Sequence, residues 1–397
     1  MHIKIIVNEI FIIIYIEPCV NKVRCKIKIL VTSFFGNFGD EVLFDVLYNQ
    51  LIKYLPQNSI KVLSNKKTYL EKNIESKPNT LLNFFKNTLE SDAVIFTGGG
   101  IIQDRTSLLN VVFHVSRIFI TKILKKKILL YAIGVEKLKF PVSVFMIKSA
   151  LKRCDLIILR DKQSLDLLLD LGLNKDRLIV GCDLALNNIC FKKQTKDSKE
   201  NQIVISLMHN LNYPKYIPVS LYINYINFVG LPKNLNNFID EFCVFITKMI
   251  EINYKIIFIP FSYNKDLKLA NYIEKKIKNK NFIIYKELLT LDKIREIYSK
   301  SLMLIGMRLH SIILSYCFNT PFIALPYSSK IENFLENNDL IDYKVDFSNF
   351  KSDELIKKIT FIQNEYDAVQ EKLLINKKHY SHELMNMENQ LKKFLDL

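Results

Sequence analysis

The sequence predicts an α/β protein with two doubly wound domains that face each other across a cleft. Three observations lead to this fold class. Short apolar or β-branched runs alternate with amphipathic stretches, which is the pattern of parallel sheets with helical crossovers. A polar, charged break at 191–201 divides this alternation into two similar halves. The length of 397 residues suffices for two hydrophobic cores of ordinary size.

In the first half, residues 26–190, predicted strands lead into turns and helices. The run KIKILVTSF at 26–34 is β-branched, as expected of a buried parallel strand, and helical spacing follows at 41–55. The later strands of this half are predicted at 91–100, 126–135, 154–160 and 176–186. Strands that alternate with helices form a parallel sheet with right-handed crossovers.

The second half, residues 202–350, repeats the alternation. Its strands are predicted in NQIVISLM, YKIIFIPF, NFIIYKE, LMLIGMRLH and PFIALPY, with helices near 236–251, 265–280 and 311–318 and in DKIREIYSKS. Two such domains create a cleft at the carboxyl ends of both sheets, where ligands of doubly wound folds bind. The tail at 351–397 is expected to form one or two amphipathic helices that pack back across the halves.

The first 25 residues form an extension whose role stays open. Its apolar run IFIIIYI covers only 10–16, far below the ~20 residues that cross a bilayer. Glu9 precedes the run and no small-residue cleavage site follows it, so no signal peptide is predicted. The run is a short strand, a membrane-touching segment or part of an extension upstream of the true start.

The composition excludes some classes of protein. The net charge of +16 comes from lysines that are spread along the chain, so nucleic-acid binding is not predicted. Anionic substrates, or peripheral contact with an anionic membrane surface, suit this charge better. The seven cysteines form no CxxC pair and no His/Cys ligand spacing, which indicates reduced thiols in a cytoplasmic protein without a zinc site.

Two glycine-containing turns follow predicted strands of the first half. In FGNFGDE, Gly36, Asn37 and Asp40 stand where a helix begins, and backbone N–H groups there bind anions readily. Asn37 and Asp40 are also ordinary helix-capping residues. The run Gly98, Gly99 and Gly100 lets the backbone approach a ligand closely, but glycines after a strand are equally common in plain turns.

Two arginines and a histidine are candidates for the cleft. Arg160 closes the strand CDLIILR, where its planar fork suits a carboxylate or phosphate, or an ion pair with Asp161 or Asp155. Arg308 and His310 follow the corresponding strand of the second half, and in an extended segment their side chains would share one side. Histidine can transfer a proton near neutral pH, although a helix-start histidine bonded to backbone is the ordinary alternative.

Taken together, these stretches resemble the polysaccharide pyruvyl transferase family. They follow one another in the family's order from about Lys28 to Phe334, which is most of the chain. The strongest is the run GMRLHS at 306–311. The other matching stretches are Gly36 to Asp40, Phe96 to Gly100, Arg160-Asp161 with Ser164, Leu171-Gly172, Ile259 to Phe261 with Asp266, Thr320 to Ala324, and Tyr327 to Lys330.

The resemblance implies two Rossmann-like halves arranged as in the GT-B glycosyltransferases. It also implies transfer of a pyruvyl group from phosphoenolpyruvate to a sugar of a cell-surface polysaccharide or its lipid-linked precursor, with formation of a ketal. Phosphoenolpyruvate would be the co-substrate, and no cofactor or metal is expected. Arg160, Arg308 and Leu309 would bind this donor, and His310 would be the acid/base.

The remaining candidates concern the cleft and the sugar acceptor. They are Gly36, Asn37, Asp40, Gly98, Gly99, Gly100, Tyr327 and Lys330. The sequence departs from the family's pattern where Met208-His209 ends a strand that carries an arginine in many relatives. It departs again at Ser328-Ser329, where an acidic residue often precedes the lysine. Both departures bear on the choice of acceptor.

Two other functions stay open at this point. A glycosyltransferase with a nucleotide-sugar donor could use the same two-domain fold, because a fold does not fix the chemistry of its site. A non-catalytic surface protein that binds membrane through its lysines is the alternative outside the enzymes.

Overall fold

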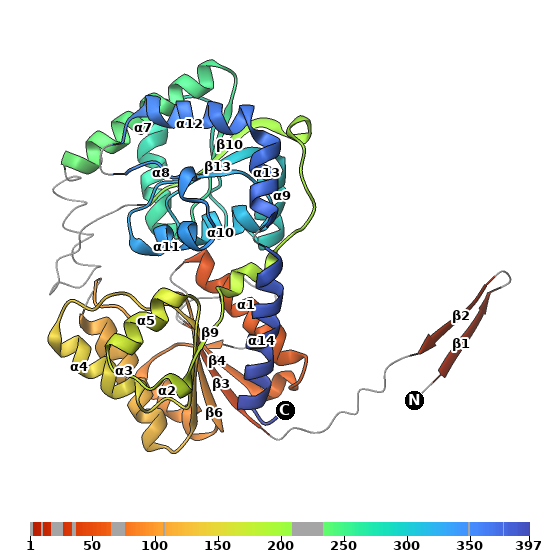
Figure 1. Ribbon diagram of the computed structural model, residues 1–397, viewed down its shortest axis with the longest axis vertical. Helices are drawn as coiled ribbons and strands as arrows, with labels where there is room; N and C mark the ends of the chain where they lie inside the picture. Colours follow the sequence, from red (N-terminus) through yellow and green to blue (C-terminus); the bar gives the residue numbers. More distant parts are fainter. Residues whose placement is uncertain are drawn as a thin grey trace.

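The computed structural model describes residues 3–8, 11–16, 27–33, 37–64, 76–105, 108–208, 233–347, 350–375 and 377–397. The chain forms two α/β lobes, one above the other in Figure 1, each built on a parallel sheet. The predicted fold class is therefore confirmed.

The first lobe contains a seven-stranded parallel sheet in the order β5-β4-β3-β6-β7-β8-β9. Its strands are β3 (Ile29–Ser33), β4 (Ile60–Leu63), β5 (Ser76–Lys77), β6 (Ala93–Thr97), β7 (Lys127–Ile133), β8 (Leu156–Leu159) and β9 (Leu178–Val180). The chain leaves β3 toward β4 and later moves in the opposite direction from β6 to β9. This reversal creates a switch point, where such folds bind ligands.

Helices cover both faces of the first sheet. They are α1 (Phe38–Ile52), α2 (Leu81–Leu89), α3 (Leu108–Ile123), α4 (Pro141–Leu151) and α5 (Lys162–Asp170). The buried residues of α1 belong to one core cluster, and those of α2 to α5 belong to a second cluster. Right-handed crossovers explain this division, because the direction of travel along the sheet decides which face a connecting helix covers.

The second lobe contains a five-stranded parallel sheet in the order β12-β11-β10-β13-β14. Its strands are β10 (Glu200–Ser206), β11 (Lys255–Phe258), β12 (Phe282–Ile284), β13 (Ser301–Gly306) and β14 (Phe322–Ala324). Its helices are α7 (Lys233–Glu251), α8 (Tyr263–Ile277), α9 (Leu291–Lys300), α10 (Leu309–Cys317) and α11 (Ser329–Asn337). Strand β10 already begins inside the segment predicted as a linker, since Glu200 pairs with Ser301.

The tail forms three helices, whereas one or two were expected. They are α12 (Ser352–Asn364), α13 (Tyr366–Ile375) and α14 (Lys378–Phe394). Helix α14 bridges the lobes: the Tyr380 hydroxyl donates to Asn338 of the second lobe at 2.9 Å, and the Tyr54 hydroxyl of the first lobe donates to Glu388 at 2.6 Å. The tail thus packs back across both halves, as predicted, and α14 runs along the first lobe in Figure 1.

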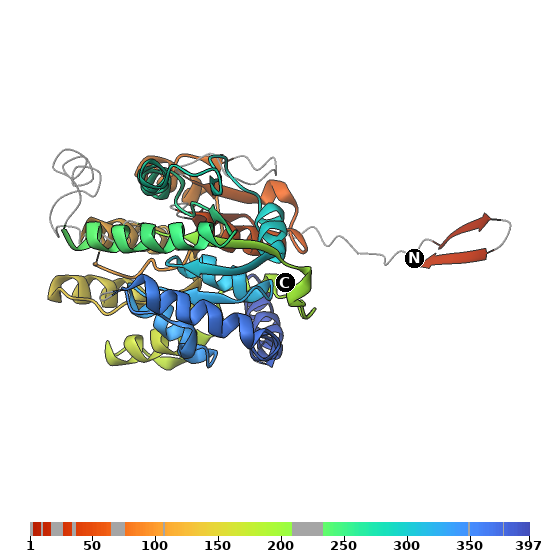
Figure 2. The same cartoon turned by 90° about the horizontal axis from the view of Figure 1, so that it is seen from above.

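The N-terminal extension contains an antiparallel pair, β1 (Ile3–Asn8) and β2 (Phe11–Ile16), which forms a sheet of its own. The pair lies apart from the two lobes in Figures 1 and 2. Of the interpretations given to the run at 10–16, a short strand agrees with the structure.

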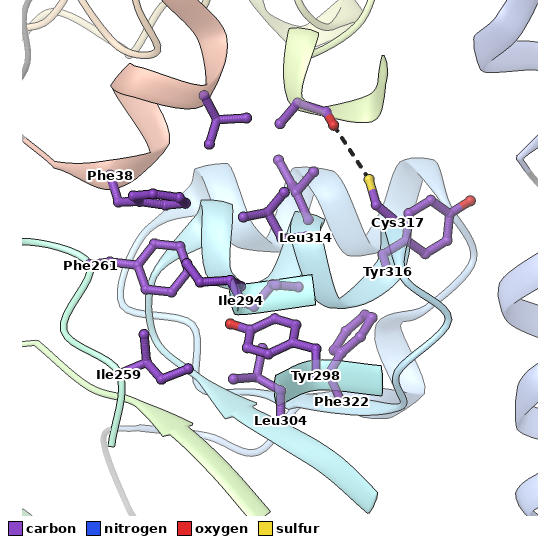
Figure 3. Packing of buried hydrophobic residues seen from close by; sticks show 14 of the residues in the cluster. Phe38, Ile259, Phe261, Ile294, Tyr298, Leu304, Leu314, Tyr316, Cys317 and Phe322 are labelled. Carbon is purple, nitrogen blue, oxygen red and sulfur yellow. Dashed lines mark hydrogen bonds between the residues drawn. The ribbon is translucent and has the colours of Figure 1, made fainter. Parts of the chain in front are cut away.

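The lobes touch at the start of α1. The backbone N–H of Phe38 donates to the carbonyl of Phe261 at 2.7 Å, and the two rings meet edge to face with centroids 5.6 Å apart. Figure 3 shows this pair at the left side of the packed residues of the second lobe, together with the bond from the Cys317 thiol to the Ala185 carbonyl at 3.5 Å. These contacts fix α1 against the second lobe at the edge of the cleft.

Candidate functional site

A cavity of about 100 Å³ lies between the lobes, at the carboxyl ends of the strands. Ten of the residues proposed from the sequence line it. They are Asn37, Asp40, Gly99, Gly100, Arg160, Arg308, Leu309, His310, Tyr327 and Lys330, and Phe261 completes the wall. Gly98 does not line the cavity, and Gly36 lies outside the described residues.

Two helices begin at this cavity, one from each lobe. Asn37 caps α1 by accepting the N–H of Asp40 at 3.2 Å, and its amide donates to the Asp40 carboxylate at 2.9 Å. Arg308 stands at the cap position of α10. Asn37 is therefore both a capping residue and part of the wall. Helix N-termini favour negative charge, so both helices raise the affinity of the cavity for an anion.

Arg308 and His310 do not lie in an extended segment, and that prediction was wrong. The chain turns into α10 directly after β13, so Arg308 has extended backbone while His310 belongs to the first helical turn. Both side chains still reach the same cavity. The Arg308 guanidinium binds both oxygens of Asp266, with N–O distances of 3.1 and 2.5 Å. Asp266 is fully buried, and it also accepts the N–H of Ser262 at 2.7 Å.

Arg160 extends from the end of β8 and is held by two carboxylates. Its Nε lies 3.2 Å from Asp161, which caps α5, and its Nη1 lies 3.7 Å from Asp183. The alternative pair with Asp155 does not form, because Asp155 accepts the N–H of Ile128 and lies beside Lys122. Arg160 is buried at the cavity wall, where a cation acts strongly on a nearby anion.

Asp183 was not predicted from the sequence, although it contacts a basic side chain of each lobe, Arg160 and His310. One of its oxygens accepts the N–H of Ala185 at 3.0 Å, and the other lies 3.5 Å from Nε2 of His310. Burial raises the pKa of Asp183, but His310 and Arg160 outweigh it and bring the pKa below its ordinary value. Asp183 follows β9 as Arg160 follows β8, and this position at a strand end was the signal in the sequence.

Lys330 brings a third cation to the cavity and is paired with Glu136. Arg105 lies on the other side of that carboxylate at 3.3 Å, and its guanidinium stands 5.7 Å from the centroid of the Tyr327 ring. Burial lowers the pKa of Lys330 from its usual value. Burial alone would raise the pKa of Glu136, but Lys330 and Arg105 lower it overall. Neither Glu136 nor Arg105 was predicted from the sequence.

Glycines allow these side chains to approach the backbone. A Cβ at Gly39 would collide with the His310 imidazole, and one at Gly134 would lie 2.6 Å from Cζ and Nε of Arg160. Gly98 has a φ of +130°, which residues with a side chain rarely adopt. The backbone conformation therefore explains a glycine at this position, although Gly98 does not line the cavity. The absence of a side chain at Gly39 and Gly134 therefore leaves the space that His310 and Arg160 occupy.

A second cavity, of about 240 Å³, adjoins the first and shares Arg160, Leu309 and Lys330 with it. Asp183 lines this second cavity, as do Tyr380 and Glu383 from α14. Burial raises the pKa of Glu383. The Asp183–His310 contact thus lies where the two spaces adjoin.

One residue of each departure from the family's pattern, Met208 and Ser328, has a clear place in the structure. Met208 packs against the hydrophobic core of the second lobe, and His209 lies outside the described residues. Ser328 is the cap residue of α11. Across the described ranges, no group of three or more His, Cys, Asp and Glu side chains could hold a metal ion, and no helix is long and apolar enough to cross a membrane.

Solved structures with similar folds support the two-lobed architecture. A co-structure of MnaA from S. aureus with UDP gives a TM-score of 0.60 at 13% identity, over 94% of this chain and 98% of that one. A putative UDP-N-acetylglucosamine 2-epimerase from Listeria monocytogenes gives 0.57 at 13% identity, over 93% and 97%. Anabaena HepE in complex with UDP gives 0.57 at 12% identity, over 93% and 100%. At these identities the likeness concerns the GT-B-like fold alone.

Sequence comparison identifies the family. The chain is 23% identical over 315 residues to the amylovoran biosynthesis protein AmsJ of Erwinia amylovora, which covers 75% of this chain and 71% of AmsJ. The sequence profile described as polysaccharide pyruvyl transferase matches residues 37–329, from the cap of α1 to the start of α11. The chain belongs to the polysaccharide pyruvyl transferase family.

Proposed function

We propose that this protein transfers a pyruvyl group from phosphoenolpyruvate to a sugar of a cell-surface polysaccharide or its lipid-linked precursor, forming a ketal. The observation that carries the proposal is the convergence of Arg160, Arg308, Lys330 and His310 on one small cavity between the lobes. Membership of the family and the similarity to an amylovoran biosynthesis protein support a sugar acceptor.

The cations of the cavity suit a small dianion or trianion. Phosphoenolpyruvate carries a carboxylate and a phosphate, and Arg160 and Arg308 would bind these groups from opposite lobes. Each cation is already held by a carboxylate: Arg160 by Asp161, Arg308 by Asp266 and Lys330 by Glu136. These carboxylates fix the cations before the donor arrives, so little reorganisation opposes binding. No resident cofactor is needed for this donor.

His310 would supply the proton for the reaction. Protonation of the methylene carbon of phosphoenolpyruvate makes C2 electrophilic, and a sugar hydroxyl adds to it with loss of its proton. The bond between C2 and the phosphate oxygen then breaks, and phosphate leaves with its electron pair. A second hydroxyl of the same sugar adds to C2 and loses its proton, which completes the ketal. Proton transfer by a positioned side chain commonly contributes about 100-fold or more to the rate.

Asp183 would orient His310 for this step. Its oxygen lies 3.5 Å from Nε2, and within the described part of the chain neither atom has a hydrogen-bond partner. A carboxylate at this distance stabilises the protonated imidazole and restricts its rotation. The adjoining cavity of about 240 Å³, which Asp183, Asn337 and Tyr380 help to line, would hold the acceptor sugar.

The test separates donor binding from turnover at His310. The variant His310→Gln should keep its fold by circular dichroism and bind phosphoenolpyruvate with near wild-type affinity by calorimetry, because both arginines remain. Phosphate release in the presence of a glycolipid extract should fall about 100-fold or more. In the matched variant Asp183→Asn, which keeps the shape of the positioning group, phosphate release should also fall, because the amide no longer stabilises the protonated imidazole.

Three results would change the proposal. Near wild-type turnover of His310→Gln would make His310 a structural residue. Loss of donor binding in a folded His310→Gln protein would make it a binding residue. Consumption of UDP-sugars by a wild-type protein that leaves phosphoenolpyruvate untouched would identify a glycosyltransferase instead.

A further inference from the structure

The outer surface of the first lobe carries a concentration of exposed apolar side chains. Helices α2, α3 and α4 pack side by side on the sheet face opposite α1. Their inner residues fill the core, yet their outer residues are also apolar: Ile123 is 75% exposed and Phe145 is 74% exposed. The exposed set, here named the apolar face, is Leu81, Leu82, Phe85, Leu89, Leu109, Val112, Ile123, Val142 and Phe145.

Charge is segregated around the apolar face. The segments 76–89, 108–127 and 137–154, which contain the three helices and their flanks, have no Asp or Glu. Their exposed or partly exposed basic residues are Lys77, Lys86, Lys122, Lys125, Lys126, Lys127, Lys137, Lys139, Lys148, Lys152 and Arg153. Helices α8 and α9 of the second lobe instead mix acidic and basic residues. Lys122 and Lys127 pair with Asp155 and Asp396, which lie outside these segments, and the other basic residues leave a positive border around the apolar face.

We propose that the apolar face docks on the surface of an anionic lipid bilayer. Apolar side chains of this size enter the boundary between headgroups and acyl chains, while the lysines around them attract anionic headgroups. A second copy of the chain is a poorer occupant, because two faces of the same sign repel each other. An anionic bilayer can bury the apolar side chains and also attract the basic residues around them.

The apolar face reaches the mouth of the cleft. Helices α3 and α4 both begin at the carboxyl edge of the sheet, and the loop before α3 contributes Gly99 and Gly100 to the cavity wall. Asp104 ties the two helix starts together by accepting the N–H groups of Lys139 and Phe140 at 2.9 and 3.0 Å. Glu136, the partner of Lys330, comes one residue before the basic segment. Resting on the proposed function, this continuity would hold the cleft close to a sugar carried on a membrane lipid.

The test is vesicle binding by the full-length protein. It should sediment with vesicles of phosphatidylcholine and phosphatidylglycerol, and much less with phosphatidylcholine alone or in high salt. The double variant Ile123→Ser/Phe145→Ser should weaken binding to the anionic vesicles about 10-fold, because it removes two exposed apolar groups from the contact. The matched control is Ile252→Ser/Ile375→Ser, which changes side chains that are 61% and 71% exposed on the second lobe and the tail. This control should bind vesicles as the wild type does.

Equal vesicle binding by the two double variants, or no binding by the wild type, would overturn the docking surface. A dimer that the Ile123→Ser/Phe145→Ser change dissociates, seen by light scattering, would assign the face to a second copy and also overturn it. Calorimetry with phosphoenolpyruvate reports on the donor site independently. Vesicle binding without donor binding would leave the docking surface standing and remove the proposed function.

Discussion

Arg160 in the first lobe and Arg308 in the second occupy corresponding positions, since each follows a strand and precedes a helix, but they are held differently. Arg308 binds both oxygens of Asp266, a fully buried carboxylate of its own lobe. Arg160 lies 3.2 Å from Asp161 and 3.7 Å from Asp183, and Asp183 also contacts His310 of the other lobe. One arginine is a fixed part of its lobe, and the other belongs to a network across the cleft.

This difference assigns different tasks to two residues of the same type. A bidentate pair with a buried carboxylate fixes the direction of the Arg308 guanidinium, so Arg308 presents a preformed positive group. Arg160 is held less closely, at 3.2 Å from Asp161 and 3.7 Å from Asp183, and Asp183 also contacts the second lobe. A donor held between them would therefore be fixed by the second lobe and enclosed by the first.

The largest expected effect comes from Arg308→Ala. It should lower the free energy of unfolding by about 3–5 kcal/mol, because the buried Asp266 carboxylate loses its cation. Arg160→Ala should lower it by only about 1–2 kcal/mol, because Asp161 still caps α5 and Asp183 keeps His310. Urea denaturation measures both. Arg308→Lys should bind phosphoenolpyruvate almost as weakly as Arg308→Ala, because one ammonium cannot serve Asp266 and a donor together.

A double variant controls for the buried charge. Adding Asp266→Asn to Arg308→Ala should recover part of the lost stability and none of the donor binding. If Arg308→Ala unfolds at the same urea concentration as the wild type, the contrast between the arginines is wrong.

The lobes should also differ in their response to acid. Burial, and then the charge of Arg117, lower the pKa of His114 in α3 from 6.5 to about 3. The unfolded chain binds this proton first, so the first lobe loses stability as pH falls below about 6.5, with the loss complete near pH 3. Between pH 7 and pH 4 the loss is about 3 kcal/mol.

Denaturation at pH 7 and pH 4 measures this loss. His114→Leu should remove most of this pH dependence, whereas the same change at the exposed His382 should leave it intact. A His114→Leu protein with an unchanged acid response would assign the effect to other groups.

The smallest expected effect comes from adding a methyl group at a glycine near the cavity in each lobe. Gly134→Ala should weaken phosphoenolpyruvate binding about 10-fold, because the added methyl lies 2.6 Å from Cζ and Nε of Arg160 and moves the guanidinium. Gly306→Ala is the matched change in the second lobe, where the methyl first meets Ile312 and Ser311, both at 2.9 Å, and not the Arg308 guanidinium. It should lower stability and leave donor affinity unchanged, as calorimetry on folded protein would reveal. Equal losses of affinity in both variants would remove the distinction.

The order of strands and helices could be predicted because the strands of both parallel sheets are buried and read as apolar runs. Leu30, Ile95 and Ile305, for example, are fully buried. The tail could not be divided correctly, because its helix breaks at Glu365 and Lys377 have no glycine or proline to mark them. Propensity alone gives no boundary in such a sequence.

The site was predictable where a residue follows a strand in a matching motif, and not where its role depends on the opposite lobe. Arg160, Arg308 and His310 line the cavity as the motifs suggested. Asp183 acquires its role from His310, and Gly39 acquires its role from the same imidazole. Such dependence exists only after the lobes have come together, so no local pattern reports it.

The bridging helix α14 has a consequence for how the chain is made. Met387, Leu391 and Phe394 of this helix complete the core that α1 and the first sheet share, and Met387 accepts the N–H of Cys182 at 3.3 Å. A ribosome synthesises those residues only after the whole second lobe. The first lobe therefore cannot finish folding when its own sequence has emerged, and one of its apolar surfaces stays uncovered until α14 has also been synthesised.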